Sequence, residues 1–182
     1  RTLEIAEDDL PRDLFTVTKD KLEKTAYWLT RHNDLFKTNH QAVGIAALAW
    51  SGKILQDGTL TENAYKKLES IIDAQTNEGW FPEVGHMDVG YTFLTVEFVT
   101  MVMELWNNWE SIAVFQRAFD FACEWIHPDL TIGDEYGVCH NPYLSRIAVI
   151  LMSKYSGRAS YIQQRLERES LGFKGYKSVL AD

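Results

Sequence analysis

The sequence predicts an all-α protein, an antiparallel array of helix pairs with six to seven helices. Apolar residues recur every three or four positions along most of the 182-residue chain, which is the spacing of a buried helix face. No segment has the pattern expected of a strand. Long loops alternate with short turns, and this alternation favours neighbouring helices that run antiparallel.

Each expected helix is an apolar stripe bounded by turn or cap signals. All of them are expected to lie in a single domain, since this length suits one core. Residues 1–17 lack a clear period and predict an extended arm, and residues 171–182 predict an irregular tail. The predicted helices cover 18–31, 41–55, a stretch that begins at 59, 91–106, 109–126, 142–155 and 157 to about 170.

Helix starts are marked by short polar side chains. Thr59 to Glu62 has the pattern of a capping box. Asn141-Pro142 is an N-cap followed by a first-turn proline. Asn39 and Asp88 also stand where N-caps are wanted, and capping alone would explain them.

The long loops precede Gln41, Tyr91 and Pro142, at intervals of roughly fifty residues, as in helix-pair repeats. Each one leads into an unusually apolar helix, and a more polar helix follows. The apolar helices are therefore expected to line the inside of a curved array. Since the short turns occupy the other side, all three long loops should meet on one face, over three helix N-termini that favour an anionic or hydroxyl-rich ligand.

The loop over 75–91 is the richest in functional groups. Its glycines and its proline fix a definite path, and loops so built often carry binding or catalytic groups. Histidine and tyrosine are candidates for proton transfer, while aromatic, amide and acidic groups can bind a sugar. The candidate catalytic residues are His40, His86, Tyr91, Tyr136 and His140. The candidate substrate-binding residues are Asn39, Trp80, Phe81, Glu83, Asp88, Glu135, Asn141 and Arg146.

Several of these residues also have a purely structural interpretation. Trp80 and Phe81 are equally well explained as a plug at the end of the core. Glu97 and Glu104 lie on the most apolar predicted helix, where an unpaired carboxylate is costly. They are expected either to pair with a cation or to face a polar channel, and we favour the channel for Glu97.

Composition narrows the classes of partner. A formal charge of −8 argues against nucleic acid and anionic membranes as partners. Cys123 and Cys139 have no metal-ligand spacing, and no apolar run is long enough to span a bilayer. The first residue is Arg1, so the chain is expected to be a trimmed protein or a piece of a longer one. We expect a soluble protein of the bacterial cytoplasm or periplasm, without a cofactor.

The motifs resemble those of α/α-toroid proteins. Gln75-x-x-x-Gly79-Trp80 is similar to a repeat of triterpene-cyclase-type toroids. The run Glu78 to Glu83, then Asp88-x-Gly90-Tyr91, His127-Pro128-Asp129 and Glu135-Tyr136-Gly137, is more similar to uncharacterised bacterial toroids of the heparinase II/III-like polysaccharide lyase type. The Asn39-His40 pair resembles the same lyases. The resemblance implies a partial α/α toroid that binds a poly- or oligosaccharide.

This chain departs from the families in several ways. The aspartate-rich motif of triterpene cyclases and the zinc ligands of prenyltransferases are absent. Val138-Cys139-His140 replaces the Ser-Arg-Asn of the bacterial toroids, so an arginine is lost. Six or seven helices are about half of a closed toroid. The chain is therefore expected to be an open arc, part of a longer chain, or half of a homo-oligomer.

Three functions are compatible with the sequence. The first is a carbohydrate-active domain, possibly a polysaccharide lyase that acts by β-elimination on an acidic glycan. The second is a non-catalytic helical module that binds a glycan or a protein. The third is a toroid that acts on isoprenoids, which the missing acidic motif disfavours and the very apolar helix over 91–106 supports.

Overall fold

The computed structural model describes residues 11–34, 36–133 and 135–172, and within this part of the chain it is all-α. Pairings between extended residues occur here only as isolated bridges, without a strand. Neighbouring helices pack antiparallel, as predicted. The described residues form seven helices: α2 (Arg12–Thr30), α3 (Thr38–Leu55), α4 (Gly58–Ala74), α5 (Val89–Trp106), α6 (Ile112–Cys123), α7 (Arg146–Met152) and α8 (Gly157–Gly172).

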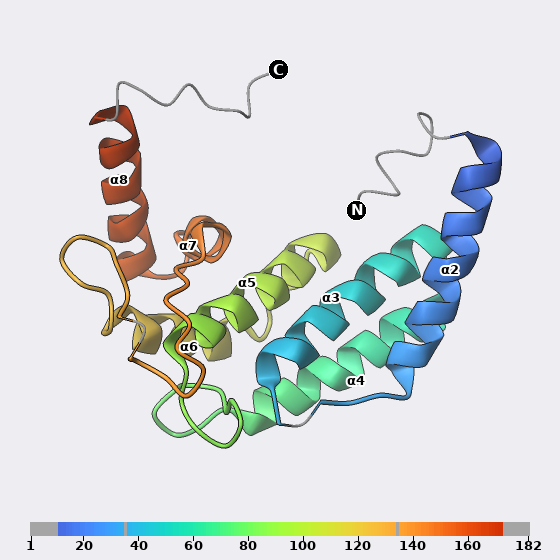
Figure 1. Cartoon of the computed structure of the whole chain (residues 1–182), viewed down its shortest axis with the longest axis horizontal. Helices are drawn as coiled ribbons and strands as arrows, with labels where there is room; N and C mark the ends of the chain where they lie inside the picture. The colour runs from blue at the N-terminus through green and yellow to red at the C-terminus, as the bar shows by residue number, and fades with distance from the viewer. Residues whose placement is uncertain (1–10, 35, 134, 173–182) are drawn as a thin grey trace.

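The helices form an open, U-shaped array with α2 at one end and α8 at the other (Figure 1). Helix α3 packs against α2, α4 and α5, and α5 also packs against α6 and α7. Helices α3, α5 and α7 face the inside of the U, and α4 and α6 lie on its outer side (Figure 1). This is the inner and outer arrangement that the alternation of apolar and polar helices predicts.

Helix α5 forms the centre of the core. Its buried side includes Val89, Phe93, Val96 and Val99, none of which has any exposed surface. A stripe along the other side is half-buried and consists of Tyr91, Leu94, Phe98, Met101 and Leu105. It is the one helix of the described residues that is long and apolar enough to cross a membrane, and 61% of its residues are buried inside the protein. A core helix meets the same criterion, so the finding is weak evidence for a membrane span.

Several predicted helix starts are wrong. Helix α2 begins at Arg12, so residues 12–17 are helical rather than an arm, and α3 begins at Thr38. The capping box at Thr59 is wrong, because the Asp57 carboxylate accepts the Thr59 N–H at 2.8 Å and the helix begins at Gly58. Residues 1–10 and 173–182, which include most of the predicted tail, lie outside the described residues; Gly172 is the last residue of α8.

The predicted start of the sixth helix is also wrong. Asn141-Pro142 does not cap it. Residues 140–145 are not helical, and α7 begins at Arg146 with Ser145 as its N-cap. The Ser145 hydroxyl donates to Glu97 Oε2 at 2.7 Å, and Tyr143 donates to the same oxygen at 2.7 Å. Glu97 thus binds two hydroxyl groups instead of facing a channel, and no Lys or Arg of the described residues forms an ion pair with it.

Candidate functional site

The three long loops meet at one face of the molecule, which we call the rim. It consists of Asp34 with residues 36–40, residues 82–91 and residues 136–141. The first two segments are joined by the Thr38 hydroxyl, which donates to Pro82 O at 2.7 Å, and by Val84 N, which donates to Phe36 O at 2.6 Å. The second and third are joined by Val89 N to Tyr136 O at 3.2 Å. The predicted meeting of the loops is confirmed, but the N-termini of α3 and α5 alone lie at the rim, because α7 begins further along α5.

Asp88 connects the second and third segments through its side chain. It has no exposed surface, and its two carboxylate oxygens accept different backbone N–H groups, Tyr91 N at 2.9 Å and Cys139 N at 3.0 Å. The first bond caps α5, as predicted. Asp88 is thus a structural residue with both carboxylate oxygens in hydrogen bonds.

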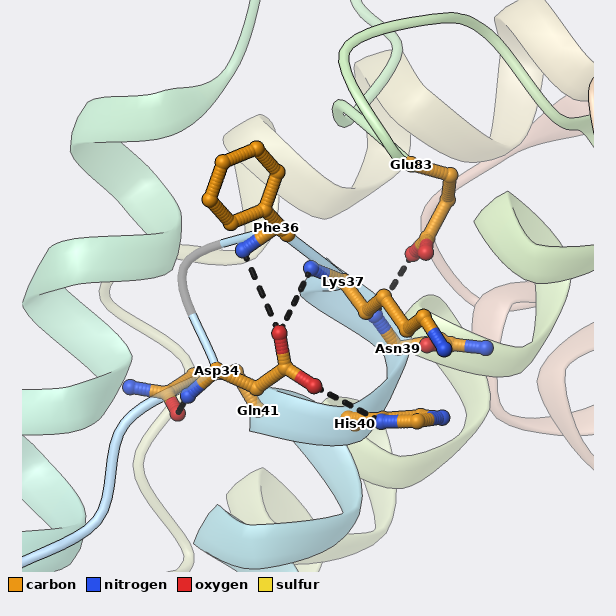
Figure 2. Close-up of polar contacts among 7 residues, drawn as sticks. All are labelled: Asp34, Phe36, Lys37, Asn39, His40, Gln41 and Glu83. Atoms are coloured by element: carbon orange, nitrogen blue, oxygen red, sulfur yellow. Dashed lines mark hydrogen bonds and ion pairs between the residues drawn. The ribbon is translucent and has the colours of Figure 1, made fainter.

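Glu83 connects the first two segments. Its side chain is 1% exposed, and Oε1 accepts the Asn39 N–H at 2.6 Å (Figure 2). Within the described part of the chain, Glu83 Oε2 and Asn39 Oδ1 are buried without a hydrogen-bond partner. Burial raises the pKa of Glu83 to about 7, and the negative charges of Asp88 and Asp34 add to this effect.

Asp34 organises the start of α3. Its Oδ1 accepts the N–H groups of Phe36 and Lys37, each at 3.2 Å, which fixes the turn that leads into the helix. Its Oδ2 lies 2.9 Å from Nδ1 of His40. Figure 2 marks this contact with a dashed line. When the carboxylate accepts a proton held on Nδ1, the other imidazole nitrogen, Nε2, is left as a base.

His40 and Asp34 lie on the wall of a cavity of about 390 Å³, which we call the α2–α3–α4 cavity. This volume lies within the usual range for small-molecule sites. The Trp28 ring stacks on the His32 ring, with centroids 3.8 Å apart. Lys67 is 5% exposed, and its Nζ donates to His32 O at 2.7 Å and to Asn33 Oδ1. The lining residues are Trp28, Leu29, His32, Asn33, Asp34, His40, Gln41, Gly44 and Lys67.

Of the predicted catalytic residues, His40 alone lines this cavity. His86, Tyr91 and His140 lie elsewhere on the rim, where His86 and His140 are exposed and Tyr91 is half-buried. Burial raises the pKa of Tyr91, and the nearby Cys139, Asp88 and Glu83 raise it further. The Tyr136 hydroxyl lies 2.9 Å from His127 Nε2, and its ring packs on Trp125, so this side chain belongs to a separate aromatic cluster.

The predicted substrate-binding residues are also divided. Asn39, Glu83 and Asp88 lie in the rim and are buried; Asn141 lies there with its carbonyl against Gly90. Phe81 has no exposed surface and packs on Phe115 with ring centroids 5.6 Å apart, so it fills the core. Trp80 donates to Glu78 at 2.7 Å. Glu135 is exposed and folds back toward Gly133.

Arg146 does not join the rim. It is the first residue of α7, and the preceding Ser145 binds Glu97, which lies eight residues into α5. At 1.5 Å of rise per residue this places the start of α7 roughly 12 Å from the start of α5. Arg146 therefore lies away from the rim, and not among the loop residues with which it was predicted to form a site.

The Gln75 side chain holds the predicted Gln-x-x-x-Gly-Trp motif against α6. Gln75 Nε2 donates to Gly79 O at 2.8 Å and to Val114 O at 2.7 Å, and Arg117 donates to Gln75 Oε1. The described residues contain no group of three or more His, Cys, Asp or Glu side chains that could hold a metal ion. The Gln-x-x-x-Gly-Trp motif thus joins the end of α4 to α6 through hydrogen bonds.

The sequence interpretation missed Asp34, Lys67 and Trp28. Lys67 had a visible signal, because Leu60, Ala64 and Ile71 place it on the apolar face of α4, where a lysine is unusual. Comparisons with protein-family models, with curated proteins and with solved structures gave no match. The site is therefore interpreted from its own geometry.

Proposed function

We propose that this protein is a carbohydrate-active domain, part of an α/α toroid, that binds an acidic sugar in the α2–α3–α4 cavity. The observation that carries the proposal is the Asp34–His40 pair on the wall of a cavity that also contains an indole ring and a buried ammonium group. The pair offers a base, the indole a flat apolar surface, and the ammonium a partner for a carboxylate.

Trp28 suits the apolar face of a sugar ring. It is 55% exposed, and its stacking on His32 holds the ring in one orientation. An ordered aromatic surface binds with little loss of side-chain entropy, and the flat face of the indole accepts C–H groups. Binding of this kind would orient the sugar relative to His40.

Lys67 suits the carboxylate of an acidic sugar. An ammonium group has three N–H donors, and two acceptors of the protein are bound to it here. Burial lowers the pKa of Lys67, because removal from water disfavours the charged form. A carboxylate in the cavity would favour the charged form and would therefore bind with a gain in electrostatic energy.

These groups fit β-elimination. His40 Nε2 would take the proton from the carbon next to the carboxylate, and Lys67 would stabilise the negative charge that develops there. The electron pair would form a C=C bond while the bond to the glycosidic oxygen breaks. The imidazolium of His40 would then return the proton to the departing oxygen.

The test is a panel of uronate polymers, with the unsaturated product followed by its ultraviolet absorbance. We expect product with the wild-type chain and a loss of about a hundredfold or more with His40→Ala, as for the removal of a general base. His86→Ala is the control, since this histidine is exposed on the rim outside the cavity. Equal activity of the two variants would contradict the role of His40, and an inactive wild type would contradict lyase chemistry.

A second function, binding of a glycan or a protein partner without turnover, is favoured by an exposed apolar pair on the rim. Phe36 is 73% exposed and Val84 is 43% exposed, and a backbone hydrogen bond joins them. Under this alternative, calorimetry would detect glycan or partner binding without an absorbance change. Trp28→Ala would weaken glycan binding, whereas Phe36→Ala would weaken protein binding.

A further inference from the structure

Two buried acceptor atoms at the rim have no donor among the described residues. Glu83 Oε2 and Asn39 Oδ1 belong to residues that are already joined through Glu83 Oε1 and the Asn39 N–H. A deprotonated carboxylate and an amide oxygen both accept hydrogen bonds and cannot satisfy each other. Leaving such atoms unpaired in the interior is costly, and one proton on Glu83 turns Oε2 into a donor.

The position of Glu83 is fixed by its backbone. Glu83 N donates to His86 O at 2.7 Å, and His86 N donates to Glu83 O at 2.9 Å, which closes a tight turn. Val84 and Gly85 in this turn have φ values of 52° and 80°. On either side of Glu83, Pro82 accepts the Thr38 hydroxyl and Val84 donates to Phe36. The carboxyl group is therefore held against the first turn of α3.

Burial and two neighbouring acids oppose a negative charge on Glu83, and together they outweigh the Asn39 N–H, whose hydrogen bond lowers the pKa of Glu83. Asp34 from the first segment and Asp88 from the second are both acidic and raise its pKa. The charge of Glu83 contributes to the raised pKa of Tyr91 on α5 and of Cys139 in the third segment. Both of these groups are therefore neutral at pH 7. Lys37, which precedes α3, also lowers the pKa of Glu83, and its effect is the smallest of those named.

We propose that Glu83 is a proton-controlled latch of the rim, closed when Glu83 is protonated and bonded to both the N–H and the side-chain oxygen of Asn39. Loss of the proton leaves both buried acceptors without a donor and adds a second negative charge near Asp88. The contact between residues 82–86 and the start of α3 then loosens. Because His40 follows Asn39 directly, the latch also controls the order of the Asp34–His40 pair.

The sign of the effect follows from the pKa. The pKa of Glu83 rises from 4.5 in the unfolded chain to about 7 in the fold, so the folded state holds the proton more tightly. The rim is most stable below pH 4.5 as far as this group is concerned, and it loses that stability as the pH rises through about 7.

Hydrogen exchange tests the latch. After correction for the intrinsic rate, we expect protection of residues 36–41 and 82–86 to fall by about two orders of magnitude between pH 5 and pH 8. Glu83→Gln should remove this dependence, because its amide accepts from the Asn39 N–H and donates to Asn39 Oδ1 at every pH. Glu78→Gln, a change of the same kind at an exposed residue of the same loop, should keep the wild-type profile.

Two results would overturn the latch: a wild-type protection that does not change between pH 5 and pH 8, or the same profile in wild type and Glu83→Gln.

A direct titration of the wild-type protein needs no variant. Carbon-13 NMR of the side-chain carboxyl groups should show one glutamate with a midpoint near 7, and the Asn39 side-chain amide should shift with it. Titration of every glutamate below pH 5.5 would contradict the proposal.

Discussion

At the residue scale, two glycines determine how closely the third loop approaches α5. A Cβ atom on Gly90 would overlap with the carbonyl oxygen of Asn141, and one on Gly137 would overlap with the Asp88 carboxylate. Neither glycine has a positive φ. Glycine is therefore required at these two positions by the space available, and the close approach is what allows Asp88 to reach Cys139 N.

Gly90→Ala should destabilise the protein by about 1–3 kcal/mol, because the third loop must move away from α5. The free energy of unfolding in urea measures the loss. Gly44→Ala is the matched control, since Gly44 is also helical but a Cβ atom added to it would meet no atom within 4 Å, and alanine there should stabilise α3 by about 0.5–1 kcal/mol. Equal changes in the free energy of unfolding for the two variants would show that backbone entropy, and not the space around Gly90, determines the effect of the substitution.

Residue patterns predicted part of this site. Asp88 was predicted as a cap because a short acidic residue precedes an apolar run, and the cap is present. The Asp34–His40 pair was not predicted, because Asp34 lies in a loop and His40 in α3, and the spacing between a loop residue and a helix residue is not fixed by the sequence. Lys67 was missed because its hydrogen-bond acceptors, His32 O and Asn33 Oδ1, lie in the connection between α2 and α3, far from Lys67 in the sequence.

At the scale of the element, one buried carboxylate positions a short helix. Glu97 on α5 is 7% exposed and accepts hydrogen bonds from Tyr143 and Ser145. Ser145 in turn accepts the Ala148 N–H at 2.9 Å and caps α7. The apolar period predicts a helix near this part of the chain, but the contact with Glu97 determines where it begins.

Glu97→Ala should destabilise the protein by about 1–3 kcal/mol, because two hydroxyl groups lose their acceptor. Hydrogen exchange of residues 146–152 should increase with the same variant. Glu97→Gln keeps one acceptor oxygen and should lose less. Glu104→Ala, an exposed glutamate on the same helix, should change the free energy of unfolding by less than about 0.5 kcal/mol. An equal loss of unfolding free energy in Glu97→Ala and Glu104→Ala would contradict the role of Glu97 in positioning α7.

At the scale of the whole molecule, the core and the rim protect their side chains to different degrees. Cys123 is half-buried on α6, and burial raises the pKa of its thiol to about 12. Cys139 is exposed in the third loop segment of the rim. The two cysteines therefore report on two parts of one fold.

Iodoacetamide at pH 8 should modify Cys139 in the folded protein at least about a hundredfold faster than Cys123, since alkylation requires an accessible thiolate. Peptide mass spectrometry measures both rates in one sample. In urea the two rates should become similar. Fast modification of Cys123 without denaturant would mean that α6 opens independently of the rest of the core.

The all-α class, the antiparallel pairs and the meeting of the loops were predictable because each depends on local periods and on connection lengths. The depth at which α7 begins was not, because it depends on a pairing of Glu97 with residues 46 and 48 positions away. Closure of the array into a toroid depends on surfaces at α2 and α8 and remains a prediction.

The two side-chain ties of the rim have different consequences while the chain is being made. Glu83 can bind Asn39 as soon as α3, α4 and the loop after α4 have left the ribosome. Asp88 cannot bind its partner until Cys139, which is 51 residues further along, has been made. During that interval α5 has neither its third-loop partner nor α7 to cover it. A nascent chain paused there would present the most apolar helix of the protein to chaperones.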